Sequence, residues 1–460
     1  MTKAKSARFT EGSLFDKIFL YALPLIITGI LQLLYNAADQ MVVGRFSGDP
    51  YALGAVGSTS SLNNLIINFL IGISVGSSVV IVQYYGAKKE EEVSKAVHSS
   101  IALAIIGGLI LSVTGSLVCE PLLKLIGTKD VFMENAVLYV RIICLGIPAS
   151  SIFNFGATVL RSIGDSRTPL IILASTGIIN VILNLVFVIG FHMSVDGVAI
   201  STIISQYLSA ISVIAVLRKS NECYCFRFSK LGFDRIALKK IFAIGIPSGI
   251  QSSLFSISNV TIQSGANTLA PEVISANAIS STIEGFTYTA MHSFQQAAIT
   301  FTGQNYGAGK LDRVKKSLLY AMLQVTLVGI IVGYVEILFS RQLANIFIDP
   351  TDPNKVAVLN AVGVRIRIML GTYFLCGIME VFSGYLRGLG YSFTTMVCSL
   401  TGACLLRIVW VKFIFPLEPF NNPIGLYVCY PVTWLMTCAA LGIFCIVYTR
   451  QTRKKQLQKL

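Results

Sequence analysis

Apolar runs recur along the whole chain, and each is about 20 residues long, enough for a helix to cross the hydrocarbon core of a bilayer. Of 460 residues, 54% are hydrophobic and 13% are charged, whereas a soluble domain has about 25% charged residues. The mean hydropathy is +0.72. We therefore predict an all-α integral membrane protein with twelve transmembrane helices, at residues 15–44, 52–85, 96–118, 134–160, 168–191, 196–217, 240–263, 273–304, 317–340, 358–386, 393–415 and 425–448.

Basic residues are concentrated in alternate loops, which predicts the orientation of the chain. One side carries Lys88, Arg161, Lys310, Arg450 and the basic segment 218–240. The other side has few basic residues: Arg45, Lys124, Lys129, Arg341 and Lys355, with Lys412 near its edge. By the positive-inside rule, both termini are expected in the cytoplasm and the protein in the plasma (inner) membrane. The net charge of +14 then reflects membrane orientation rather than nucleic-acid binding.

Three features of the first half return in the second half at nearly constant spacing. They are Gln83–Lys89 with Gln304–Lys310 at a shift of 221, Leu160–Gly164 with Leu386–Gly390 at 226, and Pro24 with Pro247 at 223. We predict two six-helix lobes, 1–220 and 241–460, joined by a basic linker at 221–240. Six spans per half imply a pseudo-two-fold axis along the membrane normal, and a substrate cavity between the lobes near the midplane.

Asp39 is the only charged residue in the apolar segment 18–44. It continues a stripe of Thr28, Gln32 and Asn36, whose spacing of three or four residues places them on one helix face. Asp39 near a membrane face could instead reach water or Arg45, but six residues separate the two and place them on different faces. Since a carboxylate in lipid is costly, the stripe predicts a water-lined ion or substrate path.

Polar stripes in later spans could meet Asp39. They comprise Ser150, Asn154 and Thr158; Thr176, Asn180 and Asn184; and Thr202, Gln206 and Ser209. Their oxygens could bind a small cation, or accompany a proton on Asp39. The alternative is a set of interhelical hydrogen bonds worth about 0.6 kcal/mol each. In the second half the intramembrane carboxylates are Glu284, Glu336 and Glu380; we expect Glu336 to be solvated near the outer end of its span. Arg161 and Arg387 are expected to snorkel to the cytoplasmic face.

With these features the chain resembles the multidrug and toxic compound extrusion (MATE) family over essentially its whole length. The resemblance rests on the twelve spans in two lobes, Asn36–Gly44 in span one, Gln83–Lys89 and the paired Leu-Arg-x-x-Gly motifs. It implies a V-shaped antiporter that expels organic, often cationic, compounds in exchange for Na⁺ or H⁺.

The resemblance also implies roles for single residues. Asp39 matches the first-helix aspartate that takes part in ion coupling, and Asn180 and Thr202 match its polar neighbours. Asn184 stands where many relatives have a second aspartate. The relatives that bind their cation in the C-terminal lobe use carboxylates in spans seven and ten, where this chain has Ser253–Ser256 and Cys376. The N-terminal site is therefore favoured, with Glu284 and Glu380 as alternatives in the second lobe.

These arguments predict a secondary active antiporter with Asp39 as its coupling carboxylate and no catalytic residues. The ion-coupling group is Asp39, Asn154, Asn180, Asn184 and Thr202; the substrate cavity is expected to include Gln32, Asn36, Asn64, Asn68, Glu284 and Glu380. We expect no cofactor and no bound metal beyond the coupling H⁺ or Na⁺. The expected partners are a drug-like small molecule and the lipid bilayer, without nucleic acid, and the chain is expected to be a monomer.

Two other functions remain open from the sequence. A flippase for lipid-linked oligosaccharides or lipids would share this architecture, but a pyrophosphate cargo needs a cationic cavity, and the charges expected in the cavity are mostly acidic. An integral membrane enzyme is disfavoured because His98, His192 and His292 are widely separated and lack metal-ligand spacing. The lone Cys223-x-Cys225 pair lacks a second ligand pair.

Overall fold

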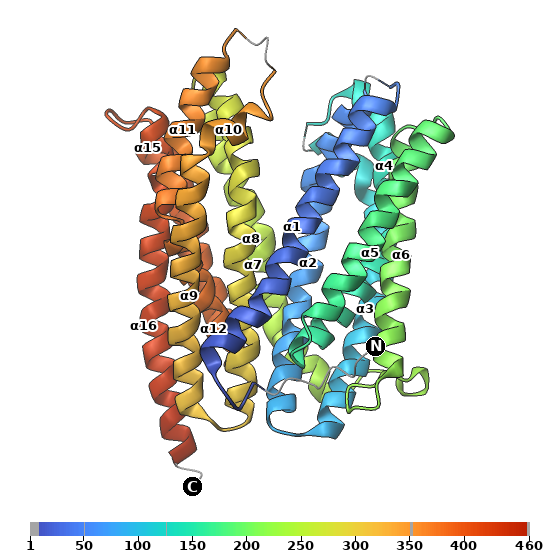
Figure 1. The fold of residues 1–460 in the computed structure, drawn as a ribbon, viewed down its shortest axis with the longest axis vertical. Coiled ribbons are helices and arrows are strands. Elements are labelled where there is room, and N and C mark those ends of the chain that lie inside the picture. Colours follow the sequence, from blue (N-terminus) through green and yellow to red (C-terminus); the bar gives the residue numbers. More distant parts are fainter. Residues whose placement is uncertain (1–8, 50, 126, 350–352, 458–460) are drawn as a thin grey trace. The chain divides into compact units, whose positions relative to one another are not determined.

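The computed structural model describes residues 9–49, 51–125, 127–349 and 353–457, and these form helices and loops without a strand. Long helices make up most of the ribbon (Figure 1). Those of the first half are α1 (Leu14–Phe46), α2 (Ala52–Gly86), α3 (Glu90–Leu125), α4 (Asp130–Ser162), α5 (Arg167–Leu185), the π-helical η1 (Val186–Gly190) and α6 (Val195–Lys219).

The second half is more segmented. Its helices are the short 3₁₀ turn η2 (Phe228–Lys230), α7 (Arg235–Ala266), α8 (Pro271–Gly307), α9 (Leu311–Leu338), α10 (Ser340–Asn345), α11 (Lys355–Gly371), α12 (Tyr373–Gly388), α13 (Ser392–Ser399), the π-helical η3 (Leu400–Leu405), α14 (Leu406–Val409), the π-helical η4 (Trp410–Ile414), α15 (Pro423–Tyr427) and α16 (Cys429–Leu457). Each of the twelve predicted spans falls on one helix or on helices joined end to end.

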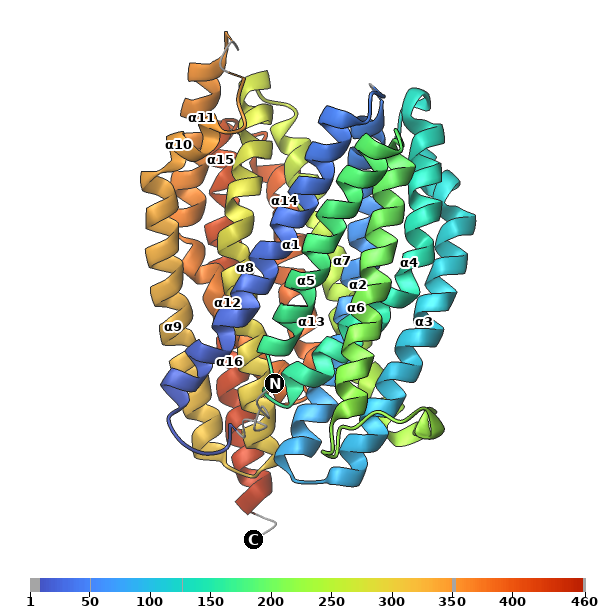
Figure 2. The ribbon, with the colours of Figure 1, turned by 45° about the vertical axis from the view of Figure 1, so that its right-hand side comes forward.

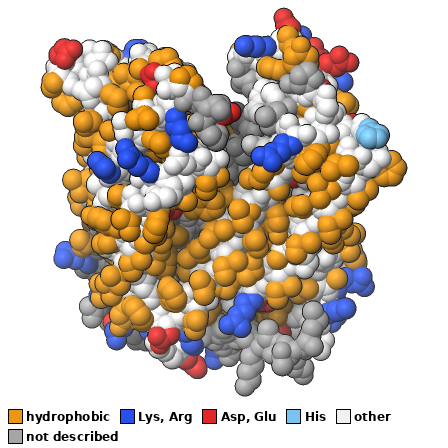
Figure 3. All heavy atoms as spheres, turned by 45° about the horizontal axis from the view of Figure 1, so that its top comes forward, with side chains coloured by type: hydrophobic (Ala, Val, Ile, Leu, Met, Phe, Trp, Pro, Cys, Tyr) orange, Lys and Arg blue, Asp and Glu red, His pale blue; other side chains and the backbone are white. Residues whose placement is uncertain are grey.

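Length and composition identify ten membrane-crossing helices among the described residues, and α11 with α12, bent by 42°, makes an eleventh span. The remaining predicted span is α8, which is 37 residues long but rich in Ser, Thr, Gln and Asn. Apolar side chains cover much of one face of the molecule, and charged ones gather mainly toward the helix ends (Figure 3). This distribution suits helices that cross a bilayer.

The chain divides into two compact units, and the division falls inside two helices. Unit 1 contains Ile27–Gly249, and unit 2 contains Phe9–Ile26 together with the residues from Ile250 onward. Thus α1 changes unit shortly after Pro24, and α7 shortly after Pro247. The predicted lobes, 1–220 and 241–460, follow chain order and stay a prediction. In the compact units, by contrast, the first part of α1 belongs with the second half of the chain, and the first part of α7 belongs with the first half.

The packing inside the two units follows the sequence repeat. In unit 1, α4 packs against α2, α3 and α6; in unit 2, α12 packs against α8, α9 and α16. The matching Arg161 and Arg387 lie in the last turns of α4 and α12. Each unit is therefore built around the helix that carries its Leu-Arg-x-x-Gly motif.

Glycines allow α2 and α7 to approach closely within unit 1. A Cβ atom on Gly72 or Gly76 would overlap the backbone of α7, at Gly249 and Ile241 respectively. These small residues serve close packing, because no larger side chain fits between the two backbones.

In unit 2, the segment that precedes α1 is hydrogen-bonded to Gln304–Lys310, the second copy of the Gln83–Lys89 motif. The backbone N–H of Phe9 donates to Oε1 of Gln304 at 3.1 Å, and Asn305 donates to the carbonyl of Phe9 at 3.3 Å. The Phe9 ring stacks on Phe301 with 4.0 Å between centroids. These contacts fix the start of α1 to the end of α8.

Candidate functional site

The candidate site lies in unit 1, where α5 runs between the second part of α1 and α6 (Figure 2). The four-residue steps of Thr176, Asn180 and Asn184 place these side chains on one face of α5, and all three are buried. Directly after Asn184, α5 ends at Leu185 and continues as the π-helical turn η1. Such turns change the register of a helix and are frequent at functional sites.

Asp39 and Asn184 are in direct contact. Nδ2 of Asn184 donates to Oδ1 of Asp39 at 2.5 Å, so the α5 amide occupies one oxygen of the α1 carboxylate. Asp39 is half-buried, while Asn184 is 0% exposed. The bond from Asn184 occupies Oδ1, and no described residue donates a hydrogen bond to the second carboxylate oxygen of Asp39.

The polar group continues from α5 to α6. Nδ2 of Asn184 also lies 3.5 Å from Oδ1 of Asn180, and Asn180 donates to Oγ1 of Thr202 at 3.5 Å. The hydroxyl of Ser201 contacts Oδ1 of Asn184. We call Asp39, Asn180, Asn184, Ser201 and Thr202 the Asp39 cluster. It joins three helices of unit 1 by side-chain hydrogen bonds.

Not every predicted member of the coupling group belongs to this cluster. Asn154 donates to Ser150 on its own helix, at 2.9 Å to the carbonyl and 3.4 Å to the hydroxyl. Of the predicted cavity residues in unit 1, Gln32, Asn36 and Asn64 are exposed and Asn68 is half-buried. Their role toward a substrate stays a prediction.

Sequence reasoning missed two residues near Asp39. Ser201 precedes Thr202 and lies four residues before Ser205, so the polar pattern of span six contained a signal for it. Tyr139 of α4 is buried and close enough to interact electrostatically with Asp39. The sequence around Tyr139 is apolar and gave no signal that this residue lies near Asp39.

In unit 2, Glu284 forms a buried ion pair. Nε and Nη2 of Arg365 donate to its two carboxylate oxygens at 2.8 and 2.9 Å, and the Arg365 side chain is 3% exposed. Arg365 also donates to Asn277 and lies over the Tyr427 ring. Glu284 is therefore fully engaged by protein donors.

Glu380 accepts a hydrogen bond from Gln295 and interacts electrostatically with Arg387. Arg387 does not snorkel as predicted: it is 4% exposed and donates to Oε1 of Gln251 at 2.9 Å. The expectation of a solvated Glu336 is also wrong, because its side chain is buried in the helix packing. Both residues lie in the last turn of a helix, and these helix ends pack against neighbouring helices instead of facing water. The position of a residue within a predicted span does not reveal such packing.

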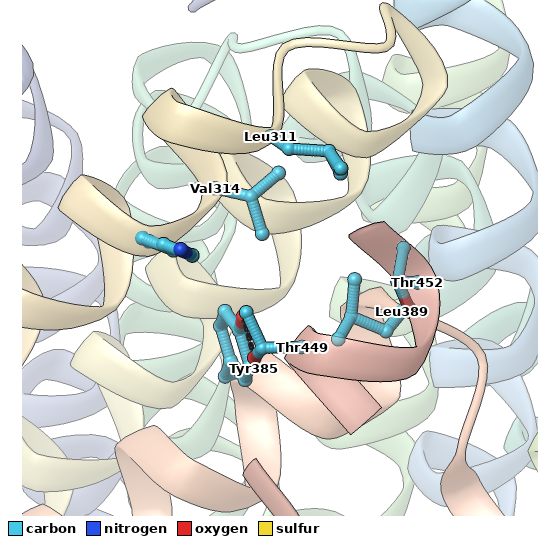
Figure 4. A pocket seen from close by; sticks show the side chains of 7 residues that line it. Leu311, Val314, Tyr385, Leu389, Thr449 and Thr452 are labelled. Atoms are coloured by element: carbon cyan, nitrogen blue, oxygen red, sulfur yellow. Dashed lines mark hydrogen bonds between the residues drawn. The ribbon is translucent and has the colours of Figure 1, made fainter. Parts of the chain in front are cut away.

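A small crevice at the end of unit 2 has no link to these polar groups. It is lined by Leu311, Val314, Lys315, Tyr385, Leu389, Thr449 and Thr452 (Figure 4). Tyr385 and Thr449 satisfy one another through a hydrogen bond of 2.7 Å.

The family model MatE matches residues 24–186 and 247–411, one copy in each half of the chain. This chain belongs to the MATE family of multidrug efflux transporters. The first matched segment contains Asp39, Asn180 and Asn184 of the Asp39 cluster, and the second contains the buried carboxylates Glu284, Glu336 and Glu380. The resemblance inferred from the motifs is thereby confirmed, and the family is one of transporters, not enzymes.

Individual MATE relatives match nearly the full length. The chain is 26% identical to the probable multidrug resistance protein YoeA of Bacillus subtilis (strain 168), covering 98% of this chain and 97% of that protein. It is 26% identical to the probable multidrug resistance protein NorM of Thermotoga maritima, covering 84% and 82%. A crystal structure of MATE in complex with MaL6 superposes with a TM-score of 0.91 at 20% identity, covering 98% of this chain and 100% of that one. The predicted MATE fold of twelve helices in two six-helix lobes is confirmed.

Proposed function

We propose that this MATE transporter is a secondary active antiporter that exports organic, cationic or amphiphilic compounds in exchange for H⁺ or Na⁺, with Asp39 as the coupling carboxylate. The observation that carries the proposal is the bond from Asn184 to Asp39 at 2.5 Å within a cluster shared by three helices. An ionisable group inside a span is costly and is retained where it serves transport.

Ion exchange at Asp39 can drive transport only if the ion binds two conformations unequally, since a ligand shifts an equilibrium through differential affinity. The Asp39 cluster supplies a structural basis for such a difference. Asn184 belongs to α5, Thr202 to α6 and Asp39 to α1, so a small shift of any helix changes the donors around the carboxylate. The membrane potential adds about 2.3 kcal/mol per charge per 100 mV.

Of the two ions, the arrangement favours the proton. Na⁺ is best held by several converging oxygens, whereas Asn184 directs an N–H group at Asp39. A proton needs only one free carboxylate oxygen, and Asp39 retains one beside the Asn184 bond. We therefore propose H⁺ as the coupling ion of the wild-type cluster, with Na⁺ as the alternative that the test below distinguishes.

The decisive experiment measures substrate-dependent ion flux in proteoliposomes, separately under a proton gradient and a Na⁺ gradient. A fluorescent organic cation serves as the cargo. We expect export to follow the proton gradient and to be accompanied by proton uptake. Export driven only by Na⁺ would overturn the choice of ion, and cargo movement without either gradient would contradict antiport.

A lipid flippase of related architecture remains the second candidate for comparison. Asp39, which has no basic residue in its cluster, argues against an anionic pyrophosphate cargo beside it, because like charges repel in a medium of low dielectric constant. The same proteoliposomes loaded with a fluorescent lipid distinguish the two, since a flippase would move the lipid between leaflets.

A further inference from the structure

Glu336 is a buried carboxylate in unit 2 that the Asp39 cluster does not involve. It lies in the last turn of α9 and is 9% exposed. Within the residues that the structure describes, its Oε2 atom has no hydrogen-bond partner. A buried carboxylate without a partner costs several kcal/mol when it is charged. Glu336 therefore requires a compensating group.

The neighbours of Glu336 do not provide a positive charge. Helix α9 packs against α8, α10, α11 and α12. From α8, Glu284 acts on Glu336 as a like charge, and Thr287 brings a hydroxyl beside it. From α11, Arg365 directs two of its donors to Glu284 rather than to Glu336.

Of the other charged groups on these helices, Arg367 of α11 is exposed, and Glu380 and Arg387 of α12 interact with each other. Arg341 of α10 donates to Asn360 at 3.0 Å on the surface. Tyr373, at the start of α12, interacts with Glu284. The buried guanidinium of Arg365 is thus already paired with Glu284.

We propose that Glu336 is a proton-binding site of unit 2, with Thr287 as its hydrogen-bond partner. Oγ1 of Thr287, like Oε2 of Glu336, lacks a hydrogen bond among the described residues. A proton on Oε2 removes the repulsion from Glu284 and turns this oxygen into a donor toward Oγ1 of Thr287. Release breaks the Glu336 O–H bond, passes the proton to water and restores a charged carboxylate that is repelled by Glu284.

A metal cation fits these surroundings poorly. Na⁺ requires several oxygen ligands, and both carboxylate oxygens of Glu284 accept bonds from Arg365. That leaves the oxygens of Glu336 and one hydroxyl. A proton needs a single acceptor, which Glu336 supplies.

The test is infrared difference spectroscopy of the full-length transporter in nanodiscs, recorded between acidic and alkaline pH. We expect a carboxylic-acid C=O band that Glu336→Gln removes, together with the loss of one titrating proton per chain. Thr287→Val should shift the band of Glu336, because it removes the hydrogen-bond partner. Glu134→Gln, at an exposed position of α4, serves as the matched control and should leave the band unchanged.

The proposal is independent of Asp39, and the two can fail separately: Asp39→Asn should leave the Glu336 band in place. An unchanged band and proton count in Glu336→Gln would overturn the proposal. If Glu336→Gln does not fold, Thr287→Val decides, and an unshifted band overturns it. Loss of the band on adding NaCl at constant pH, in the wild type and not in Glu336→Gln, would show a Na⁺ site instead.

Discussion

Asn184 on α5 and Asp39 on α1 are joined by a hydrogen bond of 2.5 Å, although 145 residues separate them in the chain. The amide donates and the carboxylate accepts. This bond ties the part of α1 that belongs to unit 1 to the polar face of α5, so changes at either residue should alter the response of the transporter to its coupling ion.

Asp39→Asn should abolish gradient-driven export while the protein still folds and binds its cargo. The substitution keeps the size of the side chain but removes the charge that an ion neutralises. Cargo binding to purified protein and export by proteoliposomes measure the two effects separately. Glu380→Gln is the matched control. If Glu380→Gln eliminates coupling and Asp39→Asn transports normally, the ion site lies in the second half of the chain.

Asn184→Asp should confer or strengthen Na⁺ dependence. It replaces an N–H donor beside Asp39 with a second anionic oxygen, which suits Na⁺ better than one carboxylate alone. Export is compared at several Na⁺ concentrations with the proton gradient held constant. An unaltered Na⁺ response would place Asn184 outside the ion site.

Gly177→Ala should destabilise the protein and alter the Asp39 cluster indirectly, through Tyr35. A Cβ atom at Gly177 would overlap the Tyr35 ring, whose hydroxyl donates to the Ala174 carbonyl at 3.1 Å. We expect a loss of about 1–3 kcal/mol in stability from overpacking and a reduced export rate, because Tyr35 lies one turn before Asp39. Gly107→Ala is the control, since a Cβ there has no neighbour within 4 Å. Equal melting temperatures for the two variants would contradict this packing.

Glu284→Gln should lower the melting temperature strongly. Removing one partner of a buried ion pair costs about 3–5 kcal/mol, because the other charge is left uncompensated. The double variant Glu284→Gln, Arg365→Gln should recover much of this loss, as measured by thermal unfolding in detergent. A normal melting temperature for Glu284→Gln, with weaker cargo binding, would instead favour the predicted role of Glu284 in the substrate cavity.

Maleimide reagents that do not cross the membrane should label Cys223 and Cys225 only from the cytoplasm. These two cysteines are half-buried in the loop before α7, whereas the other eight are buried. Labelling of the native chain therefore reports on which side of the membrane this loop lies. Cys223→Ser with Cys225→Ser provides the background, and single cysteines at Gly48 and Asn421 should react from outside. External labelling of the native loop would contradict the predicted orientation.

The twelve helical spans, the internal repeat and the polar stripe of α5 could all be predicted from the sequence. Span length, hydropathy and a four-residue period are local properties, because a helix in a bilayer satisfies its own backbone hydrogen bonds. The polar faces that carry Asp39, Asn180 and Asn184 also followed a local signal, since each stripe marks the polar face of its own helix.

The tertiary structure decided which of these polar groups bond to one another. Asn154 and Asn184 have similar sequence surroundings, yet Asn154 bonds within its own helix while Asn184 reaches Asp39. Glu336 and Arg387 were expected near water, but both are buried. Arg387 donates to Gln251, whereas Oε2 of Glu336 has no hydrogen bond within the described part of the chain. Such differences depend on how each helix is rotated and how close its neighbours lie, and side-chain packing between distant segments sets both.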